Sequence, residues 1–401
     1  MANGAPSAGL DAADAAAPAP PPTAVPGPLR LQRTLTGHAR AVAAVRLSPV
    51  DADLIASASA DRTVRLWRIG EGREVTPSAG SSGGADCGGA DCGGGSGGGA
   101  GEAGGSGKDG GGGGGGLQHG GGVNDVAWDP HGAVLASVSD DTAVRLWDAE
   151  TGALLRTLAG HTNYAYACQF DPAGRMLATA SFDETIRFWD VRTGRLLRET
   201  PAHSDPVTAL SFSHDGTTLA SGSFDGLVRL WDARNGHCLR SYASSAASAP
   251  VNDVALCHNG RYYLQATLDS RLRLIHAESG RCAKTYAGHT NEDYCCGATF
   301  VYGLPEGGGG GGGDAMDTSA DADTGGRAAA PRGIAVASGS EDGSLCVWGL
   351  NSRKLLQREL GAAAGGAGHG AAALCIAAHA SEPLVVTGGQ EPDCAIKVWR
   401  A

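Results

Sequence analysis

Short apolar runs that alternate with polar residues, broken at regular intervals by turn residues, dominate this chain. In residues 206–243 the runs PVTALSF, TTLASGS, LVRLWD and CLRSYA are separated by SHDG, FDG and ARNG. Alternation with a period of two predicts strands, because successive side chains of a strand point to opposite faces. Turns this short join antiparallel neighbours. The unit therefore predicts a sheet of four short antiparallel strands.

The same unit recurs seven times, each time with an aspartate six positions before a closing residue that is usually tryptophan. The closing residues are Trp67, Trp147, Trp189, Trp231, Ile275, Trp348 and Trp399, and the aspartates are Asp61, Asp141, Asp183, Asp225, Asp269, Asp342 and Asp393. One four-stranded sheet cannot bury both of its faces, so neighbouring sheets must cover one another. We predict an all-β fold, a seven-bladed propeller over residues 29–401.

Most units open with a histidine, and three contain a literal Trp-Asp, so they resemble WD repeats. The histidines are His38, His119, His161, His203, His289 and His369, and the fifth unit has none. The resemblance implies a hydrogen-bonded chain from the histidine through a strand Ser or Thr and the Asp to the indole N–H. We interpret the Asp and Trp series as structural, because a catalytic pair would occur once. In the fifth unit we expect apolar packing alone.

The first residues of the predicted propeller complete its last sheet. The segment LRLQRTL (29–35) precedes the first Gly-His as LLRTLAGH and CAKTYAGH precede later ones, while the last unit ends one strand short at Ala401. We therefore predict that the N-terminal strand closes the ring, and that deleting it opens the ring.

Three segments of low complexity are expected to be disordered. They are an Ala/Pro-rich tail (1–28), a Gly-rich insertion between blades 1 and 2 (73–116) and a Gly/Asp-rich insertion in blade 6 (305–332). Of the 65 glycines, 25 lie between Gly80 and Gly122. Such a stretch buries too little apolar surface to offset the entropy of ordering.

Charge and cysteine content narrow the classes of function. A net charge of −11 disfavours direct binding of nucleic acid. The 11 irregularly spaced cysteines are typical of reduced thiols in the cytosol or nucleus. No segment approaches the roughly 18 apolar residues of a membrane span, and no organellar leader is expected. Cys87 and Cys92 lack further ligands nearby, and no nucleophile stands with a base, so we expect no metal, no cofactor and no enzymatic activity.

The segments GHTNYAYACQFDPAGRMLATASFDETIRFWDVRTGRLLRETPAHSDPVTALSF, NGRYYLQATLDSRLRL, KTYAGHTNEDYC and VASGSEDGSLCVW are more specific than generic WD repeats. They resemble the adaptor subunit of COMPASS/Trithorax (MLL/SET-type) histone lysine methyltransferase complexes. The resemblance implies a non-catalytic scaffold for chromatin regulation through histone 3 lysine 4 methylation. Its implied partners are the methyltransferase catalytic subunit and core complex subunits, with a histone tail as a further candidate. The implied state is a monomer within a hetero-complex, in the nucleus or else the cytoplasm.

The resemblance also implies that an arginine of a partner peptide enters the central channel, sandwiched between two aromatic rings. The matching positions are Ala41, Ala60, Asn124, Asp140, Asn163, Tyr166, Phe182, Thr208, Phe224, Asn252, Tyr294 and Cys295. Asn124, Thr208 and Asn252 stand where the family has serine, and Gly297 stands where it has the second ring. The loss of one stacking face is expected to cost about 1–2 kcal/mol. Ordinary packing between blades is the alternative role of Tyr166 and Phe182.

Two further surfaces are implied. In the family, a groove on the opposite face binds an acidic and apolar segment of another subunit. Its matching positions are Asn259, Tyr262, Leu274, Phe300, Tyr302 and Asn351. The motifs WDVR and WDAR, which end at Arg192 and Arg234, resemble the tandem WDxR boxes of substrate receptors of cullin-type ubiquitin ligases. This second resemblance gives an alternative function, in which the two arginines contact the ligase adaptor.

Overall fold

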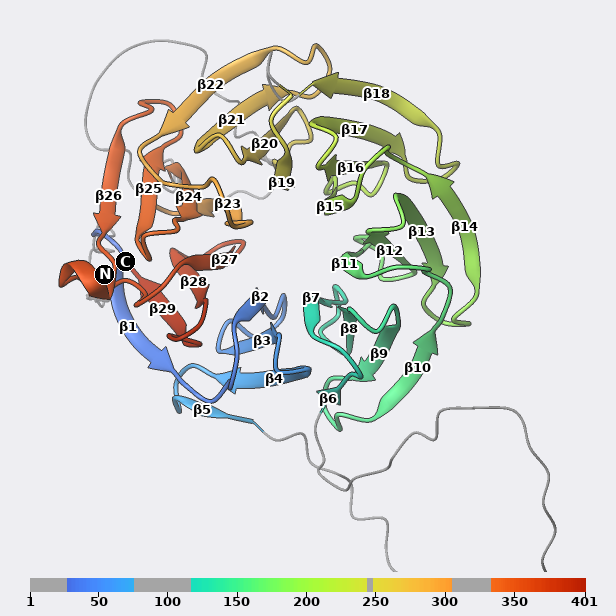
Figure 1. Cartoon of the computed structure of the whole chain (residues 1–401), viewed down its shortest axis with the longest axis horizontal. Helices are drawn as coiled ribbons and strands as arrows, with labels where there is room; N and C mark the ends of the chain where they lie inside the picture. Colours follow the sequence, from blue (N-terminus) through green and yellow to red (C-terminus); the bar gives the residue numbers. More distant parts are fainter. Residues whose placement is uncertain (1–26, 76–116, 244–247, 305–332) are drawn as a thin grey trace, which may run out of the picture.

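The alternating runs form the strands of a ring of sheets, shown in Figure 1 by a computed structural model that describes residues 27–75, 117–243, 248–304 and 333–401. Seven antiparallel sheets surround a central channel, which confirms the predicted seven-bladed propeller. Most of the expected tail and of the two Gly-rich insertions lies outside the described residues, as do Cys87 and Cys92.

Each blade runs from an innermost strand at the channel to an outermost strand at the rim (Figure 1). Blade 1 holds β2 (Val42–Leu47), β3 (Leu54–Ser59), β4 (Thr63–Arg68), β5 (Arg73–Glu74) and β6 (Leu117–Gln118). Blade 2 holds β7 (Val123–Trp128), β8 (Val134–Ser139), β9 (Val144–Asp148) and β10 (Leu154–Leu158). Blade 3 holds β11 (Ala165–Phe170), β12 (Met176–Ser181), β13 (Thr185–Asp190) and β14 (Leu196–Pro201). Blade 4 holds β15 (Val207–Phe212), β16 (Thr218–Ser223), β17 (Leu227–Asp232) and β18 (Cys238–Ala243).

The remaining blades follow the same order. Blade 5 holds β19 (Val251–Leu256), β20 (Tyr262–Thr267), β21 (Arg271–His276) and β22 (Cys282–Ala287). Blade 6 holds β23 (Ala298–Tyr302), β24 (Ile334–Gly339), β25 (Leu345–Gly349) and β26 (Leu355–Glu359). Blade 7 holds β27 (Ala373–Ala378), β28 (Leu384–Gly389), β29 (Ile396–Arg400) and β1 (Arg30–Leu35), and a short 3₁₀ helix (Ala362–Ala364) precedes it.

The N-terminal strand closes the ring as predicted. β1 pairs antiparallel with β29, with Leu31 opposite Trp399 and Leu35 opposite Ile396. Leu35 is 2% exposed and packs in the apolar cluster that joins blade 7 to blade 1. The two ends of the described chain therefore lie beside each other in one blade (Figure 1).

The described residues that flank the Gly-rich stretch both belong to the outer edge of blade 1. Residues 73–74 form β5 on β4, and Val75 N donates to Leu66 O at 2.7 Å. After the gap, Leu117 pairs with Val64, which is also in β4. The described residues on the two sides of the gap, 73–75 and 117–118, therefore both lie on β4 at the outer edge of blade 1. Residues 73–75 therefore belong to the blade and not to the insertion. The sequence did not indicate this, because the alternation of apolar and polar residues in the stretch is too short to be recognised as a strand.

Apolar clusters between neighbouring blades form the core. One cluster combines Val138 and Leu146 of blade 2 with Phe170 and Trp189 of blade 3, and the other blades repeat this arrangement. The closing tryptophan of one blade thus packs on the preceding blade. Because each sheet is covered only by its neighbours, the stability of the blades is coupled around the ring.

Side chains of the outer strands add a recurring hydrogen bond to the next blade. Arg156 in β10 donates to Arg192 O at 2.7 Å, and Arg198 in β14 donates to Arg234 O at 2.9 Å. At Gly236, where φ is 71°, an added Cβ would lie 2.6 Å from Arg198 Cδ. This position requires glycine both for its backbone conformation and for the passage of the arginine.

Candidate functional site

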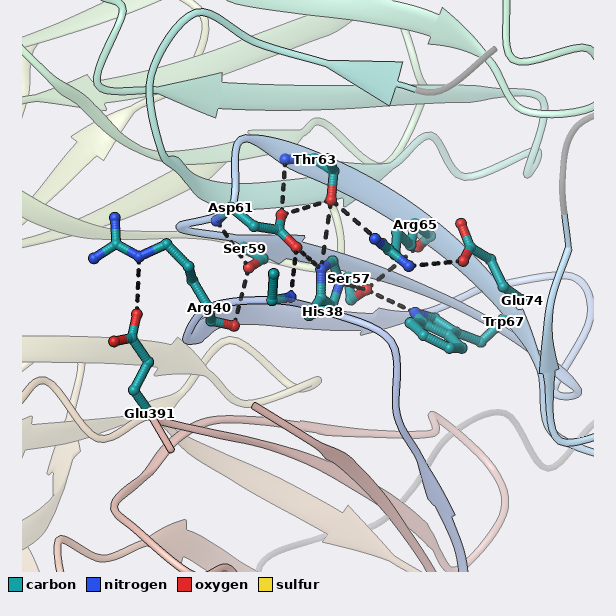
Figure 2. Close-up of polar contacts among 11 residues, drawn as sticks. His38, Arg40, Ser57, Ser59, Asp61, Thr63, Arg65, Trp67, Glu74 and Glu391 are labelled. Atoms are coloured by element: carbon teal, nitrogen blue, oxygen red, sulfur yellow. Dashed lines mark hydrogen bonds and ion pairs between the residues drawn. The ribbon is translucent and has the colours of Figure 1, made fainter. Parts of the chain in front are cut away.

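A buried polar chain stabilises the turn between the second and third strands of blade 1 (Figure 2). His38 Nδ1 lies 2.8 Å from Asp61 Oδ2, and His38 Nε2 lies 2.7 Å from Ser57 Oγ. The indole N–H of Trp67 donates to the same Ser57 oxygen at 2.7 Å. Burial alone would raise the pKa of Asp61, but hydrogen bonds from His38 and Thr63 lower it below its usual range. The chain satisfies polar groups that would be costly if left unpaired.

Blades 2, 3, 4 and 7 repeat this chain as the WD-repeat resemblance implied. The sets are His119, Ser137, Asp141, Trp147; His161, Thr179, Asp183, Trp189; His203, Ser221, Asp225, Trp231; and His369, Thr387, Asp393, Trp399. A feature that recurs in five blades is structural, because chemistry at one substrate would need it once.

Blade 5 contradicts the expectation of apolar packing alone. Arg273 forms an ion pair with Asp269 and donates to Thr267 Oγ1 at 2.6 Å. The guanidinium therefore takes the place of the missing histidine as the partner of the turn aspartate. Ile275 replaces the tryptophan, so this blade also has no indole N–H to satisfy.

Blade 6 keeps the residues of the chain but not its hydrogen bonds. Neither ring nitrogen of His289 has a hydrogen-bond partner among the described residues, and its side chain is buried. Ser338 instead donates to Gly297 O at 3.1 Å, and Trp348 donates to Ala287 O at 3.1 Å. Burial lowers the pKa of His289 to about 4. The identity of the residue alone did not predict this loss.

Backbone bulges build the wall of the central channel. In six blades the pairing of the innermost strand with the second strand shifts by one residue, and blade 6 has no such shift. The extra residues are Ala43, Asn124, Tyr166, Thr208, Asn252 and Leu374. Because a bulge re-aims side chains, each extra residue and the residue after it line one cavity of about 260 Å³.

Half of the twelve predicted channel residues line this cavity directly. They are Asn124, Tyr166, Thr208, Asn252, Tyr294 and Cys295. The other six are Ala41, Ala60, Asp140, Asn163, Phe182 and Phe224. Of these, Ala60, Asp140, Phe182 and Phe224 occupy the same place in blades 1–4, immediately before the turn aspartate. Ala60 N donates to Ala41 O at 3.0 Å, and the side-chain oxygen of Asn163 accepts from Tyr164 N at 2.8 Å.

An aromatic cluster supports one side of the cavity. The rings of Tyr166 and Phe182 lie 5.4 Å apart, and Phe224 packs edge-on against Phe182 at 6.3 Å. Burial, followed by the contact with Cys295, raises the pKa of Tyr166 well above its usual range. Tyr166 therefore presents a neutral ring to the cavity. Phe182 also packs against Phe224 of the next blade, whereas its contact with Tyr166 lies within blade 3.

The three positions where the family has serine carry donors that bridge neighbouring blades. Asn124 donates to Ala165 O at 3.0 Å, and Thr208 donates to Val251 O at 2.7 Å. Asn252 donates to Cys296 O at 2.8 Å. The larger side chains thus join blade 2 to 3, 4 to 5 and 5 to 6 at the channel. They stabilise the shape of the cavity and take up carbonyl acceptors along its wall.

The family resemblance did not indicate the charged residues that line the cavity. Arg46 and Asp125 form an ion pair of 2.9 Å, and Asp253 lines the wall beyond them. Burial raises the pKa of both Asp125 and Asp253, and the charge of Arg46 opposes this shift in both. The described lining residues thus carry two carboxylates and one guanidinium. The available signal was the tetrapeptide VNDV, which occurs at residues 123–126 and again at 251–254 and contains both aspartates.

The predicted second groove is largely part of the core between blades 5 and 6. Leu274 and Phe300 are 1% and 5% exposed and pack in one cluster with Tyr262 and Tyr302. Asn351 lies nearby and accepts from Lys284 Nζ at 2.7 Å. The sixth residue, Asn259, instead lines a larger groove between blades 4 and 5, of about 740 Å³.

The two WDxR arginines occupy equivalent exposed turns. Arg192 follows β13 and Arg234 lies in the turn after β17, and both are exposed. The carbonyl of each is held by the outer-strand arginine of the preceding blade, Arg156 or Arg198.

In the part of the chain that the structure describes, no group of three or more His, Cys, Asp or Glu side chains is arranged to hold a metal ion. Within the same residues, no helix has the length and apolar character needed to cross a membrane.

Comparison with known proteins identifies the family. The family model of the WDR5 beta-propeller domain matches residues 116–400, and that of the WD domain, G-beta repeat, matches residues 29–68. Protein Mut11 of Chlamydomonas reinhardtii is 47% identical over 68 residues, which are 16% of this chain and 18% of Mut11. Nuclear distribution protein PAC1 of Tuber melanosporum is 55% identical over 40 residues, 10% of this chain and 9% of PAC1.

A Lissencephaly-1 homolog of Monosiga brevicollis is 49% identical over 41 residues, 10% of each chain. The aligned segments thus span less than a fifth of each of these relatives. The family match covers well over half of the chain and coincides with blades 2–7. WD-repeat propellers are typically non-catalytic scaffolds for other proteins. With its seven blades, repeated polar chain and lined channel, the chain belongs to the WDR5 beta-propeller family.

Proposed function

We propose that this propeller is a non-catalytic scaffold of a histone 3 lysine 4 methyltransferase complex and acts in the nucleus. Its channel binds an arginine side chain of a partner peptide, and a second subunit binds the opposite face between blades 5 and 6. The observation that carries this proposal is the channel cavity, which is lined by the Tyr166 ring and by more carboxylates than guanidinium groups. An arginine side chain matches both features, because its planar face stacks on a ring and its rim carries charge and five donors.

A peptide titration tests the channel. A labelled arginine-containing peptide and its Arg→Ala counterpart are titrated against the full chain by fluorescence anisotropy. We expect the alanine peptide to bind at least tenfold more weakly, which corresponds to about 1.4 kcal/mol. Tyr166→Ala should weaken the arginine peptide, whereas Leu197→Ala on the rim should leave it unchanged. Equal affinity for both peptides, in the wild type and in Gly297→Phe, would eliminate the channel function.

Reconstitution tests the scaffold role. The purified chain is mixed with a purified methyltransferase catalytic subunit and core subunits, and the products are separated by size-exclusion chromatography. We expect co-elution that depends on the channel or on the face between blades 5 and 6. Failure of the chain to enter any such complex would exclude the role.

The matched geometry of the two WDxR turns favours one alternative, a substrate receptor of a cullin-type ubiquitin ligase. Arg192 and Arg234 are presented in the same way on adjacent blades. If this alternative holds, Arg192→Glu with Arg234→Glu abolishes binding to the ligase adaptor while the melting temperature stays within a few degrees. Unchanged adaptor binding would exclude it.

A further inference from the structure

Gly297 leaves a carboxylate beside the cavity where the family carries a ring. An ideal Cβ at Gly297 would lie 3.4 Å from Asp253 Oδ2 and 3.5 Å from Ile376 Cγ2. The Cβ of an aromatic residue at this position would therefore be in van der Waals contact with the Asp253 carboxylate. Gly297, Asp253 and Ile376 all line the cavity. The position of the missing ring is therefore adjacent to the Asp253 carboxylate in the cavity wall.

Asp253 has acceptor capacity left for an occupant. Its two oxygens accept from Val254 N and Ala298 N, each at 2.8 Å, and no ion pair within 4.0 Å is found for it in the described residues. A carboxylate has about four lone-pair sites. Asp125 differs, because Arg46 already pairs with it. Asp253 is therefore the carboxylate of this wall whose charge is not offset by direct contact with a cation.

The neighbouring bulge residue adds a second acceptor. Asn252 is 4% exposed, lines the cavity, and has no hydrogen-bond partner for Oδ1 among the described residues. Its amide orientation follows from the donation of Nδ2 to Cys296 O. A buried acceptor without a donor costs roughly 1–3 kcal/mol, a cost that an N–H group supplied by an occupant relieves. A cationic group with several donors meets the requirements of both residues.

We propose that Asn252 and Asp253 determine the specificity of this channel, reading the charge and the N–H groups of a guanidinium by hydrogen bonds in place of the second aromatic ring. This inference rests on the proposed arginine binding and names the residues that would achieve it here. It replaces a two-ring clamp by one ring, Tyr166, and one carboxylate. A carboxylate binds a guanidinium through directional hydrogen bonds and through opposite charge. The preference for arginine over a neutral isostere of the same shape therefore depends on Asp253.

The test varies the charge of the peptide side chain and the charge of residue 253 independently. Peptides that carry arginine or citrulline, its neutral isostere, are titrated against the wild type, Asp253→Asn, Asn252→Ser and the exposed rim control Leu197→Ala. In the wild type we expect arginine to bind at least tenfold more tightly than citrulline. In Asp253→Asn this ratio should fall to about threefold or less, because the buried charge pair is lost. Asn252→Ser should weaken both peptides severalfold, and Leu197→Ala should change neither by more than about twofold.

Each outcome decides between the two proposals. If the wild type does not distinguish arginine from alanine or citrulline, the arginine function itself fails. If the wild type distinguishes them and Asp253→Asn keeps the full ratio, arginine binding stands and the role of Asp253 is refuted. Thermal melts check that every variant is folded. If Asp253→Asn does not fold, Gly297→Leu covers the carboxylate with an aliphatic side chain and adds no second ring, and an unchanged ratio in that variant also overturns the inference.

Discussion

Replacing His289 should affect the stability of the propeller far less than replacing its counterpart in blade 4. His289 makes no hydrogen bond through its ring among the described residues, although it packs edge-on against Trp348 at 5.4 Å. His203 bonds both Asp225 and Ser221 at 2.8 Å. Since a lost bond that leaves a buried partner costs about 1–3 kcal/mol, His203→Leu should lower the free energy of unfolding by about 2–4 kcal/mol. His289→Leu should change it by less than about 1 kcal/mol at pH 7.

The two variants also differ in acid. The pKa of His289 is about 4 in the folded chain, against an unfolded value of about 6.5. The unfolded state therefore binds the extra proton first, and wild-type stability falls as the pH drops from about 7 towards 4. Between pH 7 and pH 5 this single group accounts for a loss of about 2 kcal/mol, which His289→Leu removes.

Urea unfolding followed by tryptophan fluorescence at pH 7 and pH 5 measures both effects. The reasoning is refuted if His289→Leu is as destabilised as His203→Leu at pH 7, or if it loses as much stability in acid as the wild type.

Three further predictions concern closure, glycine and blade 5, and urea unfolding measures each one. Leu35→Ala should lower the free energy of unfolding by about 2–5 kcal/mol, because Leu35 is 2% exposed in the cluster that joins blades 7 and 1. The control Leu197→Ala, at a side chain 56% exposed, should change it by no more than about 0.5 kcal/mol. Similar losses in the two variants would argue against closure by β1. Gly236→Ala should lower the free energy of unfolding by about 1 kcal/mol or more beyond the loss in Gly260→Ala. Both glycines have positive φ, but only Gly236 lies against Arg198. Equal losses would mean that the arginine side chain moves aside freely. Arg273→Met should lower the free energy of unfolding by about 2–4 kcal/mol, because Asp269 and Thr267 lose their partner. An unchanged free energy of unfolding would restore the expectation of apolar packing in blade 5.

The repeat made the architecture predictable from sequence. Asp61, Trp67 and their counterparts recur at a fixed spacing, and repeated four-stranded sheets bury their faces by stacking on one another. Closure by residues 29–35 followed from counting strands. The edge of blade 1 did not follow, because β5 and β6 have two residues each and carry no periodic pattern.

The channel was predictable only in part. The resemblance named Asn124, Tyr166 and Asn252, but a resemblance transfers the positions a family uses and cannot indicate Asp253, which matters because Gly297 lacks a side chain. The register shifts that aim these residues into the channel depend on pairing between strands, which no local sequence pattern encodes. Arg273 was missed for a related reason, since a cation that replaces a histidine is recognised only once the strands are in register.

The pairing of Arg30 with Arg400 has a consequence for biosynthesis. β1 leaves the ribosome before β29, its partner, so the edge of β1 stays open while the six intervening blades are synthesised. Commitment to the closed ring is therefore a late event, and substitutions in β29 will be felt at the amino-terminal strand. A nascent chain stalled before β29 should expose β1 to proteases even when the other blades have formed.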